Sequence, residues 1–194
     1  MRFARLSLRH CLTVAAWAIS ALAAGAGCDG KSRAQVDPGP SPTTHAGSTL
    51  QPADECNTIT TVGVHRFLNP ANDTHFYTKD LAEGGRARFK VEHQNYFRLA
   101  TANRPGFQLL YRCVLPKDLH FYTTNSSCEG AGRNEGELGY VSTTPKCGAV
   151  PLYRLVKAEN GDHFYTISDE ERDAAVQVSN YTQEQVVGYV WPKH

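Results

Sequence analysis

The sequence predicts an all-β domain with short helical turns, in which three similar units close on one another as in a β-trefoil. One observation is the tetrapeptide His-Phe-Tyr-Thr, which occurs three times, 45 and 43 residues apart. Another is an arginine eight or nine residues before each copy and an aspartate within two residues before it. Motifs that recur in register indicate internal repetition. The three units span about residues 64–104, 109–147 and 151–194.

The third unit shows the plan most clearly. Residues 151–156 alternate between two faces, an Asn-Gly turn signal follows, and residues 163–166 return, which together predict a β-hairpin. Ser168 and Glu171 then form a capping box, which predicts a short helix. Residues 181–191 are apolar and β-branched and predict one or two further strands.

The other two units follow this plan to different degrees. In the first unit, Asp80 and Glu83 take the places of the capping serine and its glutamate, so a helix is expected there as well. In the second unit, Gly130, Gly132 and Gly136 argue against a stable helix.

Closure of the three units is expected because open strand edges invite aggregation. Propellers typically use four to eight blades, so three units fit a β-trefoil better. The short helix in each unit is unusual for that fold. The alternative is a three-unit β assembly decorated with short helices.

Residues 1–27 have the composition of an export signal of the lipoprotein type, with three arginines followed by an apolar run. The run is about 15 residues long, whereas a membrane span needs about 20. Cys28 follows Ala26 and Gly27 as in a lipobox, which predicts lipidation and a bacterial cell-envelope lipoprotein. Ordinary cleavage after Ala24 or Ala26, giving a secreted soluble protein, stays open as the alternative.

Residues 28–55 are rich in Pro, Gly, Ser and Thr and are expected to form a disordered tether, with the folded domain in residues 56–194. The whole chain has a formal net charge of +1, and removal of the signal with its three arginines leaves −2. This balance gives no reason to expect nucleic acid as a partner. Contact with a membrane is expected through the lipid anchor only.

Four cysteines remain in the predicted domain: Cys56, Cys113, Cys128 and Cys147. An even number in an exported chain predicts disulfides, and four cysteines allow three pairings. We favour Cys128 with Cys147 and Cys56 with Cys113. A metal site is not expected because the chain has no Cys-x-x-Cys pair.

The repeated residues resemble a known repeat. Leu-Tyr-Arg at 152–154, Gly-Asp-His-Phe-Tyr-Thr at 161–166, Glu-Glu-Arg-Asp-Ala-Ala at 170–175 and Gly-Tyr-Val at 188–190 are similar to a repeat of unknown function in secreted and surface proteins of bacteria and fungi. The resemblance covers about residues 64–194, and three copies are expected. It implies an extracellular repeat domain that acts as a binding unit, and it carries over no catalytic residue.

Four residue types recur in every unit and are the candidate ligand-binding residues: Arg66, Asp73, His75, Tyr77, Arg112, Asp118, His120, Tyr122, Arg154, Asp162, His163 and Tyr165. The first interpretation is structural, because an arginine on an apolar strand face needs a partner and the aspartate across the hairpin turn is nearest in sequence. The alternative is a sugar pocket, with polar groups on the hydroxyls and a tyrosine ring against the apolar face of the sugar.

The three histidines could meet at a three-fold axis and hold zinc, but one histidine per unit more often means one environment repeated three times. We therefore expect no metal and no cofactor. The sequence has no Gly-x-Ser-x-Gly, phosphate-binding Gly loop or His-Glu-x-x-His motif, which argues against an enzyme. The expected function is non-catalytic recognition at the cell surface, with a surface glycan ahead of an envelope protein as partner. A protein-binding or architectural domain without a small ligand is the alternative.

Overall fold

The computed structural model describes residues 53–87 and 89–193, so the predicted signal peptide, Cys28 and nearly all of the predicted tether lie outside the described residues. The described chain is mostly β-sheet with a few short helices, which confirms the all-β class. Helix α1 begins at Ala53, so the last residues assigned to the tether are helical. Among the described residues, none of the helices is both long enough and apolar enough to span a membrane.

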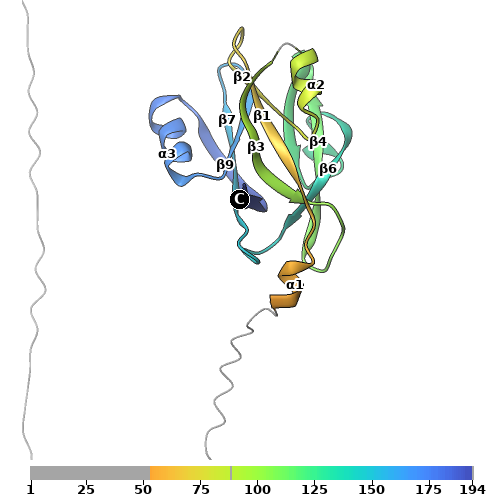
Figure 1. Cartoon of the computed structure of the whole chain (residues 1–194). Helices are drawn as coiled ribbons and strands as arrows, with labels where there is room; N and C mark the ends of the chain where they lie inside the picture. The colour runs from red at the N-terminus through yellow and green to blue at the C-terminus, as the bar shows by residue number, and fades with distance from the viewer. Residues whose placement is uncertain (1–52, 88, 194) are drawn as a thin grey trace, which may run out of the picture. The chain divides into compact units, whose positions relative to one another are not determined.

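Nine strands follow α1 in three groups of the order strand, strand, helix, strand (Figure 1). The elements are α1 Ala53–Asn57, β1 Thr61–Asn69, β2 Thr74–Thr78, α2 Leu81–Arg86, β3 Lys90–Ala100, β4 Phe107–Leu115, η1 Pro116–Asp118, β5 Leu119–Thr123, η2 Cys128–Gly130, β6 Arg133–Ser142, β7 Val150–Lys157, β8 Asp162–Thr166, α3 Asp169–Val178 and β9 Thr182–Pro192.

In each group the first strand lies between the other two and pairs with both in antiparallel fashion: β1 with β2 and β3, β4 with β5 and β6, and β7 with β8 and β9. The hairpins and the helix capped by Ser168 agree with the sequence prediction, and Ser168 accepts a hydrogen bond from the amide of Glu171. The second group has only the 3-10 turn η2 in the helix position, as its glycines predicted. Helices α2 and α3 lie on opposite flanks of the strands (Figure 1).

The predicted closed β-trefoil is wrong, because the sheet is not closed. Seven of its nine strands follow the path β2-β1-β3-β6-β9-β7-β8, and β4 branches from β6 and carries β5, so that β2, β5 and β8 are left as ends. Pairing between groups is confined to a few residues of β3, β6 and β9: Ala100 faces Tyr140, Ser142 faces Tyr189, and Arg98 faces Trp191. Strands β2, β5 and β8 form no ladder with one another, because tyrosine hydroxyls occupy the backbone groups that a ladder would use.

Tyr77, Tyr122 and Tyr165 supply those hydroxyls and are 1% exposed each. The Tyr122 hydroxyl donates to the carbonyl of Tyr77 and accepts from its amide. Tyr165 does the same for the backbone of Tyr122, and Tyr77 for that of Tyr165, with all six distances between 2.6 and 2.8 Å. Buried backbone groups must be paired. These three side chains, which we call the tyrosine ring, therefore join the three hairpins at the centre of the core.

Outside this core, the first strand of each group packs against its own helix or turn. In the first group Phe67 lies over Gly84, where a Cβ would come 2.3 Å from the Phe67 ring. Helix α2 can therefore pack this closely against β1 only because residue 84 is glycine. Leu155 and Ala175 meet in the third group. In the second group a disulfide takes this place.

That disulfide joins Cys113 in β4 to Cys128 in η2, and the other joins Cys56 in α1 to Cys147 before β7. The predicted pairs, Cys128 with Cys147 and Cys56 with Cys113, are wrong. Cys113 faces the position where the other groups place their helix, so its partner comes from η2. Cys56 is in α1, next to the loop that holds Cys147. Two disulfides fit an extracellular, oxidising setting.

Candidate functional site

Each repeated arginine lies between two glutamates rather than beside the aspartate of its own hairpin turn. Arg66 contacts Glu92 at 3.0 Å and Glu171 at 2.8 Å. Glu92 belongs to the same group of strands, whereas Glu171 comes from α3 of the third group. The predicted pairing of Arg66 with Asp73 is therefore wrong, because Glu92 and Glu171 occupy the guanidinium and Asp73 pairs with Lys157 at 3.0 Å.

The other two arginines have the same kind of partners. Arg112 contacts Glu83 of α2 at 2.9 Å and Glu135 at 3.2 Å. Arg154 contacts Glu129 of η2 at 2.7 Å and Glu184 at 2.8 Å. Neither arginine forms an ion pair with the aspartate expected as its partner, Asp118 for Arg112 and Asp162 for Arg154. Every arginine thus ties its own hairpin to the helix or turn of the preceding group, and the first arginine to that of the last group.

The glutamates of the helices also form hydrogen bonds with the hairpin that precedes the helix in the chain. Glu171 accepts from Thr166 at 2.5 Å and from the Tyr96 hydroxyl at 2.6 Å. Burial alone would raise the pKa of Glu171, but hydrogen bonds from Arg66, Thr166 and Tyr96 outweigh it and lower the pKa to about 2. Glu171 is therefore ionised at neutral pH.

Aromatic rings complete each junction. The Arg66 guanidinium lies 5.1 Å from the centre of the Phe164 ring, and the His75 ring lies 4.8 Å from it. Arg112 and His120 contact Phe76 in the same way, and Arg154 and His163 contact Phe121. The repeated histidine therefore packs against the phenylalanine of a neighbouring hairpin. We call these three places the β2/β8, β5/β2 and β8/β5 junctions.

The β2/β8 junction holds a buried hydrogen-bond network that the other two lack at the corresponding positions. The carboxylate of Asp162, 2% exposed, accepts from the His75 amide and contacts His75 Nδ1, both at 2.6 Å. It also accepts from the Tyr181 hydroxyl at 2.8 Å. Nδ1 of His75 faces this carboxylate, and Nε2 lies 3.5 Å from Glu92.

The register of the hairpins identifies the residues that correspond to Asp162. Asp162 faces Lys157 across its hairpin, Thr74 faces Asn69, and Leu119 faces Leu115. At the β8/β5 junction the counterpart is therefore Leu119, and Nδ1 of His163 is buried without a hydrogen bond. Burial is the main cause that lowers the pKa of His163. It also lowers the pKa of His120, although Glu135 acts in the opposite direction.

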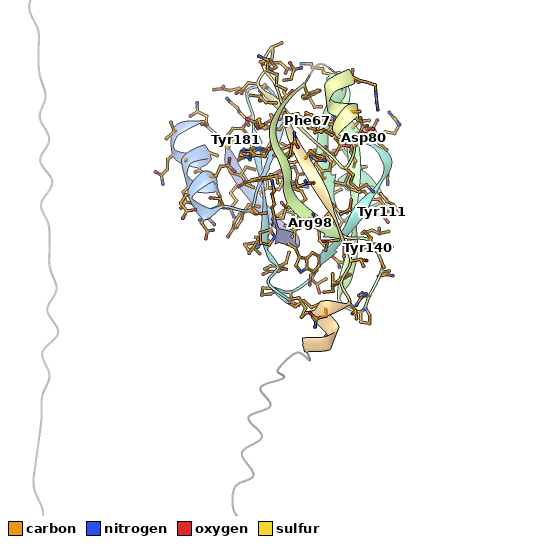
Figure 2. The ribbon with its side chains drawn as sticks, in the orientation of Figure 1. Phe67, Asp80, Arg98, Tyr111, Tyr140 and Tyr181 are labelled. Carbon is orange, nitrogen blue, oxygen red and sulfur yellow. A yellow bond between two sulfur atoms is a disulfide. The ribbon has the colours of Figure 1, made fainter. Side chains whose placement is uncertain are left out.

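A cavity of about 460 Å³ opens beside the Asp162 network. It is lined by Arg66, Asp73, His75, Glu92, Lys157, Phe164, Glu171, Ala174, Ala175, Val178, Ser179 and Tyr181. Tyr181 lies beside α3, on the opposite flank of the strands from Asp80 and α2 (Figure 2). Of the predicted ligand residues in this part of the chain, the cavity collects Arg66, Asp73 and His75 but not Tyr77. We call it the first cavity.

The tyrosine prediction is wrong for the whole set. Tyr77, Tyr122 and Tyr165 were expected to offer ring faces to a sugar, but all three are buried and their hydroxyls are used by backbone groups. Strand alternation correctly places each histidine and tyrosine on one face, but it does not tell how deep each lies.

A family model described as a domain of unknown function, DUF5648, matches residues 63–191. The chain belongs to this family. No curated protein and no solved structure matches the chain. The DUF5648 match covers the first cavity and all three junctions but gives none of their residues a role.

Within residues 53–87 and 89–193 of this DUF5648 chain, no group of three or more His, Cys, Asp or Glu side chains is arranged to hold a metal ion. The six arginine partners were not predicted as site residues. Glu83 and Glu171 had a signal, because both stand three residues after a helix cap. Glu92, Glu135 and Glu184 had none, since they reach the arginines only through strand pairing, and Glu129 had none because it lies in the short turn η2.

Proposed function

We propose that this protein is an exported, non-catalytic binding module and that carbohydrate is its ligand, bound in the first cavity. The observation that supports this is a lining that combines apolar and charged side chains. Phe164, Ala175 and the ring of Tyr181 supply the apolar part, while Arg66 and Glu92 supply charged groups. Sugar sites use the same combination, because a sugar ring has an apolar face and a rim of hydroxyls.

The polar groups are also held in place before any ligand arrives. Asp162 orients the imidazole of His75, two glutamates hold Arg66, and Asp73 binds Lys157 at 3.0 Å. A site whose side chains are already ordered loses less conformational entropy on binding. This is the physical reason to place recognition here rather than on an exposed loop.

The ionisation of Glu171 favours binding over catalysis. A glycosidase needs one carboxyl group that is protonated at neutral pH and can act as general acid. The pKa of Glu171 is lowered to about 2, so it cannot take that role. The other two carboxylates in the cavity lining are also in ion pairs: Glu92 contacts the same Arg66, and Asp73 contacts Lys157.

We further propose that the three groups of strands are copies of one unit around a common axis, and that lipidation of Cys28 tethers the domain to the envelope. The tyrosine ring supports the first proposal, because each hydroxyl serves the neighbouring hairpin in the same way. The second proposal rests on the sequence of residues 1–28. Within the domain, α1 lies at the end opposite to the β1–β2 turn (Figure 1), and Asp73 of that turn lines the first cavity.

A glycan array probed with the whole chain tests the proposed ligand. Ser179 lines the first cavity and is exposed, so Ser179→Trp should fill the cavity and abolish glycan binding. Gln177→Trp, on the same helix but outside the cavity lining, is the matched control and should bind as the wild type does. Glycan binding that survives Ser179→Trp would exclude this site, and the absence of any bound glycan would exclude the carbohydrate function.

The second candidate is an envelope-protein ligand. Val176 and Val178 of α3 are 44% and 79% exposed, and Val186 of β9 is 41% exposed. Exposed aliphatic side chains on neighbouring elements favour a protein contact. Val176→Ser combined with Val186→Ser, both outside the lining of the first cavity, would abolish capture of an envelope protein if this candidate is correct, while leaving the array result unchanged.

A further inference from the structure

A second cavity, of about 430 Å³, lies between the β1–β2 turn and the β4–β5 turn. It is lined by Asn69, Asn72, Thr74, Ala87, Phe89, Lys117, Asp118 and His120. The repeated residues Asp118 and His120 meet here, but Arg112 does not line this cavity. The function proposed above makes no use of it.

Register and packing make the second cavity the counterpart of the first. Asn69 corresponds to Lys157, because each ends the first strand of its hairpin and faces Thr74 or Asp162. Ala87 corresponds to Ser179, since they are the C-caps of α2 and α3.

The aromatic walls correspond as well. Phe89 packs on Phe76 with ring centres 5.4 Å apart, as Tyr181 packs on Phe164 at 5.5 Å. His120 in turn lies against Phe76 at 4.9 Å, as His75 lies against Phe164. The two cavities are thus built from the same positions at two different junctions.

The side chains at these shared positions differ in chemistry. The first cavity is lined by the ion pair of Lys157 with Asp73, and the carboxylate of Asp162 is buried beside it, whereas the second is lined by the neutral Asn69 and Thr74. The ring of Phe89 replaces the hydroxylated ring of Tyr181. The first cavity therefore presents more charged side chains to a ligand than the second does.

Asp118 is placed to act on a ligand in the second cavity. It is exposed, and its backbone has φ +58°, a conformation that costs energy in a residue other than glycine. Lys117 beside it has φ +68°. Such backbone strain is concentrated at functional sites. A carboxylate and two asparagine amides beside a phenylalanine ring are groups that bind sugar hydroxyls and cover a sugar face.

We propose that the second cavity is a separate subsite for an uncharged hexose unit, so that the domain binds glycans at two unlike positions. This inference rests on the carbohydrate function proposed above. Asn72 lines the second cavity and its neighbour Asp73 lines the first, so both subsites share the β1–β2 turn. One branched or extended glycan engaging both would gain affinity through effective concentration.

The test is an amide NMR titration of the whole chain with the methyl glycosides of mannose, galactose and N-acetylglucosamine. Ala87→Trp fills the second cavity, and Ser179→Trp, at the corresponding cap position, fills the first. The proposal expects amide shifts around Asn72 and Asp118 that persist in Ser179→Trp and weaken at least about tenfold in affinity in Ala87→Trp. A gentler variant, Asp118→Asn, keeps a residue that tolerates this backbone conformation and should weaken the same shifts by about tenfold.

Two results would overturn the proposal. Shifts confined to Tyr181 and its neighbours and unaffected by Ala87→Trp and Asp118→Asn would leave the first cavity as the sugar site and remove the second. No shift with any of the glycosides would remove the second subsite, and a negative glycan array would then remove the carbohydrate function too. Loss of binding in Asp118→Asn with an unchanged amide spectrum elsewhere would support the proposal even if Ala87→Trp does not fold.

Discussion

The tyrosine ring and the three junctions around it use the same repeated tetrapeptide in different ways. In the ring, Tyr77, Tyr122 and Tyr165 have matching burial and hydrogen bonds. At the junctions, the hairpin position held by Asp162 in the third group is held by Thr74 in the first and Leu119 in the second. The hydrogen bonds around the neighbouring histidine change with it.

This difference separates architecture from recognition. A position that must satisfy buried backbone groups leaves little choice of side chain, whereas a position at the rim of a cavity can change without loss of the core. The ring should therefore control stability and the junctions should control ligand choice. Four predictions test this division.

Removal of one of the three hydroxyls of the tyrosine ring should have the largest effect on stability. Tyr122→Phe leaves the buried amide and carbonyl of Tyr77 without a partner, which should lower the free energy of unfolding by about 2–5 kcal/mol. Denaturant unfolding measures this loss. Tyr111→Phe is the control, since no hydrogen bond joins the Tyr111 hydroxyl to another described residue, and it should change stability by less than about 0.5 kcal/mol. Equal effects of the two variants would contradict the role of the ring.

Loss of the buried carboxylate at the β2/β8 junction should have the second largest effect on the free energy of unfolding. Asp162→Asn replaces an oxygen with an N–H donor where His75 and Tyr181 both donate, which should cost about 1–3 kcal/mol. It should also move the His75 proton from Nδ1 to Nε2, which nitrogen chemical shifts report. Thr74→Val, at the corresponding position, should cost less, because the Thr74 hydroxyl bonds only to Asn72 among the described residues. An unchanged His75 tautomer would refute the proposed network.

The sequence predicted the local elements well, because local patterns determine them. Alternation fixed the hairpins, and Ser168 fixed the start of α3. The cysteine pairing was wrong because it depends on which segments meet in space. Cys113 meets Cys128 only because η2 packs where other groups place a helix.

The candidate site was predicted in part for the same reason. His75 and Arg66 were both predicted as site residues, since a repeated polar residue next to apolar ones requires a partner, and both line the first cavity. Their partners Glu171 and Asp162 come from the third group, and no pattern within the first unit names them. A cavity formed between two groups is likewise invisible to alternation or capping rules.

The ion pair of Arg66 and Glu171 should make stability depend on acid pH. Glu171 has its pKa lowered from 4.5 to about 2, so its contribution is complete above pH 4.5 and is lost as pH falls toward 2. With a third of its side chain exposed, solvent screening should limit this to about 1–2 kcal/mol. Glu171→Gln should therefore be less stable than the wild type at pH 6 and show a smaller further loss between pH 4.5 and 2. Parallel pH profiles for the two proteins would contradict this.

The smallest expected effect is at the β5/β2 junction. Burial lowers the pKa of His120 from 6.5, Glu135 raises it, and Arg112 lowers it. Glu135→Gln removes the opposing charge, so the pKa of His120 should fall further, by less than about one unit in this partly exposed site. NMR titration of the imidazole measures this shift.

The sign of the accompanying stability change is fixed by linkage. Because the folded pKa of His120 lies below 6.5, the unfolded chain binds more protons as the pH falls below 6.5, and the folded state loses stability there. Glu135→Gln should enlarge that loss slightly and leave the His120 contribution unchanged at pH 8, where the imidazole is neutral in both states. Because the effect stays within one junction, the amide shifts of Tyr77, Tyr122 and Tyr165 should not move. If they do move, the ring and the junctions are coupled, and the division between architecture and recognition is wrong.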